Sequence, residues 1–385
     1  MHNNRRSFLK RAFTVGAGMA LLPTSILQAS SSNQKLRVGV IGLGTCGLMH
    51  LQHALEHPNL HVAAICDENA QQIKVAQQMC GTKNPAVFTG SPKAYQALIA
   101  AQNIDLVLIA TPYQSHYMMA REALLSGKHV ACELVMGETV EEHIDIVRIA
   151  KQQNLQYSTL DDVLYRPDVM AVKQAYTAGL LGGIKFSKAG YRGALTQSLH
   201  GNYPVHALAA TSSMHASPIT TLSIEEQNAA VAINKFSKQL VPRTYITRRD
   251  VTMLVLTHED QTTSCLQASH DTETPFSIGL QIKGEKGTYT DILNYLQLST
   301  DTTWGNAAAY FADNAHPAWQ SARSEQENHA AYLALDGFVQ ALLRKENAPH
   351  DVVASATCSV VLPLAEKARR LGVTKIAFPQ FNTVV

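Results

Sequence analysis

The sequence has little charge of either sign and no long apolar run in its main part. Charged residues make up 16% of the 385 residues, and the formal net charge is +2. Without a basic stripe or an acidic tail, the charge pattern gives no sign of a nucleic-acid partner. Beyond residue 30 no segment approaches 18 consecutive apolar residues, so we expect no membrane span in the mature chain. A hydrophobic content of 46% is typical of a globular protein, and this length predicts two domains.

Recognisable metal motifs are also missing. The 16 histidines are scattered, with no HExxH and no Cys–His cluster at zinc spacing, so we predict no metal site. None of the six cysteines forms a CxxC. Cys66 and Cys132 lie in apolar runs that predict buried strands, which favours free thiols. A bridge between Cys46 and Cys66 stays open at this point.

Residues 1–30 have the pattern of an export signal. Arg5 and Arg6 precede Ser-Phe-Leu-Lys, and an uncharged run from Ala12 to Leu27 leads to small residues around Ala29. This is a twin-arginine pattern with a cleavage point near Ala29. We therefore expect the twin-arginine export machinery as a partner, folding before export, and a periplasmic location.

A dinucleotide-binding motif follows directly. A strand predicted over Leu36–Ile41 runs into Gly42-Leu43-Gly44-Thr45-Cys46-Gly47, and the apolar period of Leu48–Leu55 predicts a helix. A GxGxxG motif between a strand and a helix is the context that dinucleotide binding requires. Gly42 permits the tight turn, Gly44 lets backbone approach the pyrophosphate, and Gly47 allows close packing of the helix. The helix N-terminus would face the phosphates.

An acidic residue follows the next strand. The predicted strand Val62–Cys66 ends in Asp67, twenty residues after Gly47. A carboxylate at this place suits the ribose 2′-OH and repels a 2′-phosphate, so NAD is favoured over NADP. These six motif residues and Asp67 are the first predicted cofactor contacts.

Further strands and helices alternate up to residue 160. We predict strands over Asp105–Ala110, His129–Glu133 and Gln156–Leu160, with helices over His116–Ser126 and Val140–Gln153. This alternation predicts a parallel doubly wound sheet, a Rossmann domain over 31–160. Ligands bind at the carboxyl ends of such strands. We therefore expect further cofactor contacts there: Thr111, Tyr113, His116, Glu133 and Leu134. For His116, a role at the start of a helix is the alternative.

Residues 161–385 predict a different architecture. Strands without intervening helices indicate a largely antiparallel sheet, and a closing helix is expected over Val352–Leu371. The fold class is therefore α/β, a Rossmann doubly wound parallel sheet followed by an α+β domain with a largely antiparallel open sheet. The predicted strands are Ile184–Tyr191, Ala229–Phe236, Met253–Thr257, Thr262–His270, Phe276–Lys283 and Gly287–Ile292.

The motifs VGVIGLGTCG, ATPYQSH and GKHVACE, in this order, resemble those of the Gfo/Idh/MocA oxidoreductase family. The resemblance implies an NAD-binding Rossmann domain and a second domain that binds substrate and forms a homo-oligomer through its sheet. Ordinary dehydrogenases of this family carry Glu-Lys-Pro after GKHV, and the lysine helps to manage the substrate hydroxyl proton. Here the sequence is Glu133-Leu134-Val135, which counts against a standard alcohol oxidation.

A closer likeness is to glycoside hydrolase family 109, which comprises NAD-dependent α-N-acetylgalactosaminidases of the same fold. The family's Trp-Glu-Trp-His and Tyr-Pro-Thr-His appear here as Tyr113-Gln114-Ser115-His116 and Tyr203-Pro204-Val205-His206. The substrate half departs from the family: the link between Tyr191 and Tyr203 is shorter, and Phe276 replaces a tyrosine. Asp162, a further implied cofactor contact, replaces an asparagine. The resemblance implies a sugar or glycoside substrate but leaves the sugar and linkage open.

Tyr203 and His206 are the predicted catalytic pair. Pro204 suits the first turn of a helix, so the two side chains, three residues apart, should share one face of its N-terminal end. A phenol with a pKa of about 10 and an imidazole with a pKa of about 6.5 can handle protons together. A structural tyrosine and a helix-start histidine are the alternative. Tyr191 and Val205 complete the expected substrate contacts, with interface packing as the alternative for Tyr191.

Three classes of function stay open. The first is an NAD-dependent glycosidase that acts by transient oxidation at sugar C3, elimination, hydration and return of the hydride. The second is an NAD-dependent sugar dehydrogenase or oxidoreductase, and the third is a non-catalytic NAD-bound sugar sensor. An exported protein meets no pool of free NAD, so a reaction that regenerates NAD in every cycle favours the first class.

Overall fold

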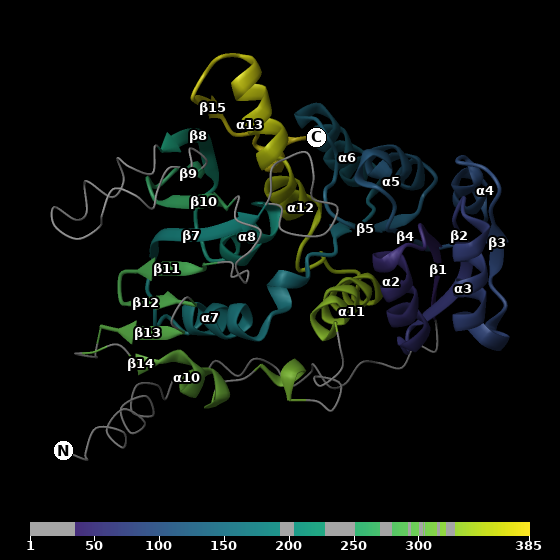
Figure 1. Cartoon of the computed structure of the whole chain (residues 1–385), viewed down its shortest axis with the longest axis horizontal. Coiled ribbons are helices and arrows are strands. Elements are labelled where there is room, and N and C mark those ends of the chain that lie inside the picture. Colours follow the sequence, from purple (N-terminus) through teal and green to yellow (C-terminus); the bar gives the residue numbers. More distant parts are fainter. Residues whose placement is uncertain are drawn as a thin grey trace, which may run out of the picture. The chain divides into compact units, whose positions relative to one another are not determined.

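The structure is a computed structural model that describes residues 35–192, 204–227, 251–269, 279–291, 294–299, 303, 305–313, 316–320 and 328–385. Helices and strands carry the labels of Figure 1. The predicted signal segment, the predicted strand Ala229–Phe236, and the residues Tyr203 and Phe276 lie outside this part of the chain. Residues from Leu36 to Val385 form one compact unit.

The first sheet is parallel and has the strand order β3-β2-β1-β4-β5-β6. This order is that of a doubly wound dinucleotide-binding fold, so the predicted Rossmann sheet is confirmed. Strand β4 is apolar and buried along its whole length, and β1 is buried from Val38 to Ile41, as expected where helices cover both faces of a parallel sheet. The elements are β1 (Leu36–Ile41), α2 (Thr45–Glu56), β2 (Leu60–Cys66), α3 (Ala70–Cys80), β3 (Ala86–Phe88), α4 (Ala94–Ala100), β4 (Leu106–Ile109), α5 (His116–Leu125), β5 (His129–Cys132), α6 (Val140–Gln153) and β6 (Tyr157–Thr159).

Helix α6 shows how local sequence sets an element's ends. The Thr139 hydroxyl accepts a hydrogen bond from the Glu142 amide at 3.1 Å, and the Glu142 carboxylate accepts one from the Thr139 amide at 3.1 Å. This capping box satisfies two N–H groups at the start of the helix. The helix ends where Asn154 takes a left-handed conformation, with φ of 51°.

The second sheet has the strand order β14-β13-β12-β11-β7-β10-β9-β8-β15. Only the β7–β10 pair is parallel among the described pairs, so the predicted largely antiparallel sheet is confirmed. The predicted strands Met253–Thr257 and Thr262–His270 correspond to the antiparallel pair β9 and β10. The elements are α7 (Pro167–Thr177), β7 (Ile184–Arg192), α8 (Pro204–Ser212), β8 (Ile219–Gln227), β9 (Val251–His258), β10 (Thr263–Ser269), β11 (Gln281–Gly284), β12 (Gly287–Thr290), β13 (Tyr295–Leu298), β14 (Gly305–Asn306), α10 (Ala307–Asp313) and β15 (Lys375–Ala377).

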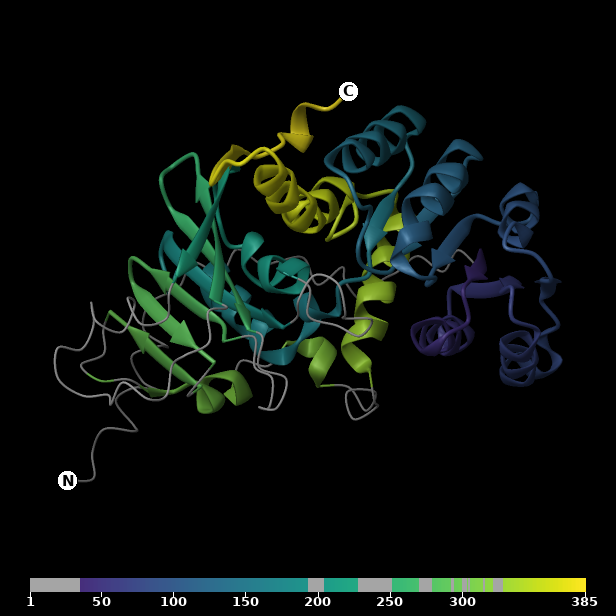
Figure 2. The same cartoon turned by 45° about the horizontal axis from the view of Figure 1, so that its top comes forward.

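Helix α8 connects the second sheet to the carboxyl ends of the first. It packs on one face of the second sheet, over β7 and β10 (Figure 2). It also contacts a short 3₁₀ helix, Asp162–Tyr165, that directly follows β6. Side chains near the start of α8 therefore lie close to the end of the last parallel strand.

The closing segment differs from the prediction. Instead of one helix over Val352–Leu371, the structure has α12 (Val352–Ser359) and α13 (Val361–Arg370), joined at Val360. Pro363 explains the break, because it has no N–H to bond the Ser359 carbonyl and its ring opposes that carbonyl. The prediction of a single helix was wrong.

Helix α11 (His329–Arg344) has no counterpart in the predicted elements. It lies beside α2 in Figure 1, and its Leu335, Phe338 and Val339 share a hydrophobic cluster with Val38 and Leu51. A helix from the second half of the chain thus completes the core of the first sheet. The boundary predicted at residue 160 separates the two sheets but not their cores.

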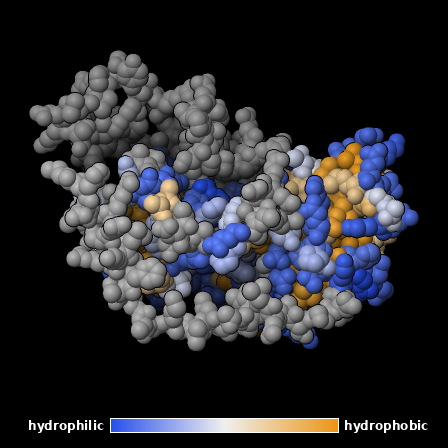
Figure 3. Space-filling view, turned by 90° about the horizontal axis from the view of Figure 1, so that it is seen from below, coloured by the Kyte–Doolittle hydropathy of each residue, from blue (hydrophilic) through white to orange (hydrophobic). Residues whose placement is uncertain are grey.

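The surface view shows where apolar side chains stay exposed. On the face in Figure 3, hydrophobic residues gather towards the end that contains α3, α4 and β3. Met79 and Val87, exposed by 36% and 38%, belong to α3 and β3.

All six cysteines are free thiols, and only Cys46 is exposed, so a Cys46–Cys66 bridge is not present. None of the described helices combines the length and apolar character that a bilayer crossing requires.

Candidate active site

A cleft of about 780 Å³ runs along the carboxyl ends of the parallel strands. Its size suits a small-molecule or cofactor site. Most of the predicted cofactor contacts line it, namely Gly42, Gly44, Thr45, Cys46, Asp67, Thr111, Tyr113, Glu133, Leu134 and Asp162. The predicted catalytic residue His206 and, from α11, Ala331 line the same cleft.

The glycine loop is shaped for a close approach of backbone to a ligand. Gly42 has φ of +84°, and a Cβ there would lie 2.6 Å from the Ala110 carbonyl oxygen. A Cβ on Gly47 would lie 2.0 Å from the Gly42 oxygen, so only glycine lets α2 pack this tightly. Gly44 caps α2 without a side-chain bond and has no atom within 4 Å of its Cβ position. Free N–H groups beside open space are what a pyrophosphate needs, so this loop fits a dinucleotide.

Asp67 holds the loop and also faces the cleft. Its carboxylate accepts hydrogen bonds from the amides of Leu43 and Asn69, both at 2.7 Å. A carboxylate has about four lone-pair positions, which leaves room for a ribose hydroxyl. Leu43 itself is fully buried, so its part in the site is this backbone bond.

His116 is buried behind residues that line the cleft and does not line it itself. Only 1% of its surface is exposed, and its ring nitrogens lie 2.7 Å from the Thr111 carbonyl oxygen and 2.8 Å from that of Val135. Burial lowers the pKa of this imidazole despite the two carbonyls. The ring thus links the ends of β4 and β5, in keeping with the helix-start alternative.

Glu133 is paired with a histidine that the motif analysis did not single out. His50, on α2, lies 2.6 Å from the Glu133 carboxylate through its Nε2. Burial alone would raise the pKa of Glu133, but the hydrogen bond and charge of His50 outweigh it and lower the pKa. His50 lies three residues after Gly47 on the same helix. This proximity to the glycine motif is the only feature of the sequence that relates His50 to the site.

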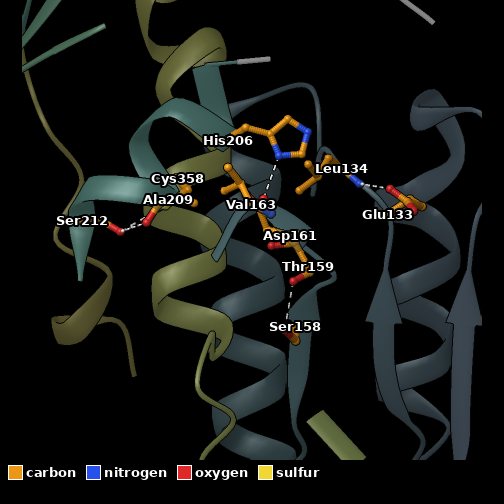
Figure 4. A network of polar contacts seen from close by, with 10 residues as sticks. All are labelled: Glu133, Leu134, Ser158, Thr159, Asp161, Val163, His206, Ala209, Ser212 and Cys358. Carbon is orange, nitrogen blue, oxygen red and sulfur yellow. Dashed lines mark hydrogen bonds and ion pairs between the residues drawn. The ribbon is translucent and has the colours of Figure 1, made fainter. Parts of the chain in front are cut away.

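The central polar contact of the cleft joins Asp161 to His206. Asp161 follows β6, is 1% exposed, and its Oδ1 lies 2.7 Å from His206 Nδ1. Figure 4 shows the imidazole above this carboxylate, with its second nitrogen turned away from it. Burial would lower the pKa of His206, but the Asp161 carboxylate outweighs it and raises the pKa to about 9. The same pairing lowers the pKa of Asp161 against its burial. At neutral pH the two groups form an ion pair.

Asp162 has the opposite pKa shift from its neighbour. It lines the cleft, where loss of solvent around its carboxyl raises the pKa of that group despite the nearby His206. Adjacent groups whose pKa values are pushed apart are typical of sites that transfer protons. The cleft therefore offers an imidazolium as a proton donor and a carboxylate as a proton acceptor.

The protonated imidazole of the described cleft lining is that of His206. No lysine or arginine is among the described residues that line the cleft. Leu134 occupies the position after Glu133 and lines the cleft with its side chain. The described part of the cleft thus has no lysine to accept or donate a substrate proton.

Of the other predicted substrate contacts, the structure describes the side chain of Val205 only. Val205 is fully buried in the core and does not line the cleft. Tyr191 lies in β7, but its side chain is not among those described, and Tyr203 lies outside the described residues. Of the predicted catalytic pair, the structure therefore places His206 only.

One cluster of the described residues has the donor types of a metal site. Ligand atoms of Asp161, Asp162 and His206 lie within 4.8 Å of one another. The Asp161 oxygen that faces the imidazole already accepts its hydrogen bond. The absence of a metal site stays a prediction.

Two family matches cover most of the chain. Residues 36–160 match the oxidoreductase family GFO_IDH_MocA with an NAD-binding Rossmann fold, and residues 241–384 match the C-terminal domain of glycosyl hydrolase 109. Both resemblances seen in the motifs are thereby confirmed, and so is NAD as the cofactor of the first domain.

Named relatives extend over nearly the full length. A glycosyl hydrolase family 109 protein of Stenotrophomonas maltophilia is 26% identical and covers 98% of this chain and 95% of its own length. An α-N-acetylgalactosaminidase of Shewanella oneidensis is 25% identical, with 99% and 97% covered. The WlbA dehydrogenase of Bordetella pertussis, solved with NADH and UDP-GlcNAcA, has a TM-score of 0.64 at 17% identity, over 90% of this chain and 99% of its own. At that identity the solved structure shows the fold alone.

Two glycine substitutions should separate folding from cofactor binding. Gly47→Ala places a methyl group against the Gly42 carbonyl, so we expect it to lower the free energy of unfolding by about 1–3 kcal/mol. Gly44→Ala meets no protein atom and should change that free energy by less than about 1 kcal/mol, yet weaken NAD binding by about 1–3 kcal/mol. Urea unfolding and calorimetric NAD titration measure both. Unchanged NAD affinity in Gly44→Ala would contradict a pyrophosphate at this loop.

Proposed function

We propose that this chain, which combines a Gfo/Idh/MocA-type NAD-binding domain with a glycosyl hydrolase 109 C-terminal domain, is an NAD-dependent glycoside hydrolase. The observation that carries the proposal is that His206, protonated through its contact with the buried Asp161, lines the same cleft as the dinucleotide loop. When bound, NAD supplies a reversible hydride acceptor for one carbon of a sugar.

The family resemblance implies a sequence of four steps on the sugar. C3 is oxidised transiently, which acidifies the proton on C2. The C1 substituent then leaves by elimination, water adds across the resulting double bond, and the hydride returns to C3. The net reaction is hydrolysis, because the sugar and the cofactor both end in their original oxidation states.

The residues of the cleft can serve these steps. His206 is protonated at neutral pH, so its Nε2 can give a proton to a leaving oxygen. The Asp162 carboxylate, with a raised pKa, can accept one. Asp161 holds the imidazole in one tautomer and orientation. Tyr203, next to the start of α8, remains the predicted partner of His206.

The dehydrogenase alternative has less support from this cleft. Simple alcohol oxidation in this fold uses a lysine after the glutamate, and Leu134 stands there. A sensor would need neither a protonated histidine nor an adjacent carboxylate. A dehydrogenase predicts accumulation of NADH and a sensor predicts no turnover, so one assay separates both from the hydrolase.

Export is part of the same proposal. The Arg5-Arg6 motif supports twin-arginine export to the periplasm, with NAD bound before transport. A cofactor that left the protein there would be lost, so tight binding and a redox-neutral cycle support each other. A sugar or glycoside substrate and homo-oligomer formation through the second sheet complete the proposal.

Chromogenic α- and β-glycosides test this function directly. Protein purified without added NAD should release the chromophore over many turnovers with no electron acceptor, no accumulation of NADH and no loss of rate in EDTA. NADH formed in proportion to product would favour the dehydrogenase. Sugar binding without turnover of any glycoside would favour the sensor.

His206→Asn should remove the proton donor while keeping a hydrogen bond to Asp161. We expect turnover to fall roughly 10²–10⁴-fold with NAD still bound, the usual effect of losing a positioned acid. Turnover of the wild type should fall as the pH rises through about 9, because His206 then loses its proton. His61→Asn, at an exposed strand position, is the matched control. Wild-type rates in His206→Asn would assign His206 to structure.

A further inference from the structure

A second, much smaller cavity adjoins Asp161. It has a volume of about 10 Å³ and is lined in part by Thr159, Asp161, Phe338 and His350. A cavity of this size holds one water molecule. It brings together the end of β6, helix α11 and the segment before α12, which are far apart in the sequence.

Three polar atoms on this cavity have no hydrogen-bond partner. They are Asp161 Oδ2, Thr159 Oγ1 and His350 Nε2, and all three atoms are buried. Their residues are only 1%, 1% and 6% exposed. Buried polar atoms in native proteins nearly always bond to protein or to ordered water. Three unpartnered atoms around a water-sized space therefore point to a ligand in that space.

The chemistry of the three atoms fits a water molecule. The ionised Asp161 oxygen only accepts hydrogen bonds, whereas a hydroxyl can donate or accept and a neutral imidazole nitrogen does either according to its tautomer. Burial lowers the pKa of His350, so this ring is neutral. A water can donate one hydrogen bond to Asp161. Its second hydrogen and its lone pairs then serve for hydrogen bonds to Thr159 and His350.

We propose that one ordered water occupies this cavity and bonds Asp161, Thr159 and His350, which makes Thr159 and His350 positioning residues for the Asp161–His206 pair. The water site stands on the geometry alone, and its consequence for catalysis rests on the proposed function. Asp161 Oδ1 already bonds His206 and, at 3.3 Å, the Val163 amide. With the water on Oδ2, both oxygens of the Asp161 carboxylate have hydrogen-bond partners.

Loss of the water should change the titration of His206 in a defined direction. The charged groups that face His206 are Asp161 and Asp162 after β6 and Glu133 after β5, and Asp161 in turn faces His350. The hydrogen bond from the water stabilises the Asp161 carboxylate most when His206 is neutral, because no imidazolium then balances the negative charge. Without the water, His206 should keep its proton to a higher pH.

Thr159→Val with His350→Leu removes two of the three partners without touching the cleft. Thr221→Val is the matched control, because the Thr221 hydroxyl is also buried without a partner but lies on β8, away from this cavity. The measurement is a histidine ¹⁵N NMR titration of the full chain, with the His206 signal assigned by its loss in His206→Asn. We expect the pKa of His206 to rise by about one pH unit in the double variant and to stay unchanged in Thr221→Val.

A crystal structure of the wild-type protein provides the second readout. It should show one water within hydrogen-bond distance of the three atoms, even if the double variant fails to fold. An empty cavity, or a His206 titration that is the same in the double variant and in Thr221→Val, would overturn the inference. Neither readout needs turnover, so a protein inactive on every glycoside but with this water in place would refute the proposed function only.

Discussion

The buried ion pair between Asp161 and His206 is the contact on which the candidate site depends. Asp161 lies at the end of the last parallel strand, whereas His206 begins a helix that packs on the second sheet. A carboxylate this deeply buried is stable as a charge only with a cationic partner. Removing one partner of such a pair typically costs about 3–5 kcal/mol. The pair therefore fixes where the start of α8 meets the end of β6, and with it the position of His206 in the cleft lining.

The same contact determines what chemistry the cleft can perform. It raises the pKa of His206 to about 9, so the imidazole is a proton donor at neutral pH. Asp162 is left to face the cleft with a raised pKa, and Glu133 is held ionised by His50. With Leu134 in place of a lysine, proton transfer falls to an imidazolium and a carboxylate. That set of groups suits elimination and addition on a sugar better than a net oxidation.

The sequence predicted what local rules decide and missed what distant contacts decide. The strand, turn and helix around Gly42 and Gly47 follow from backbone geometry, and the start of α6 follows from a capping box. The break at Val360 is also a local effect, because Pro363 four residues after Ser359 interrupts the helix. By contrast, nothing near Asp161 indicates which of two adjacent carboxylates becomes buried, because that depends on His206, 45 residues further on. The packing of α11 on α2 is equally nonlocal.

The central claim is that a hydride leaves sugar C3 and returns to the same carbon. A glycoside that the protein hydrolyses, labelled with deuterium at C3, tests this most directly when the reaction runs in ordinary water. The account predicts that the released sugar keeps its deuterium at C3, that turnover shows a primary isotope effect, and that a reaction in D₂O introduces deuterium at C2. Hydrolysis with no isotope effect at C3 and no exchange at C2 would contradict the account, because the glycosidic bond would then break without oxidation of the sugar.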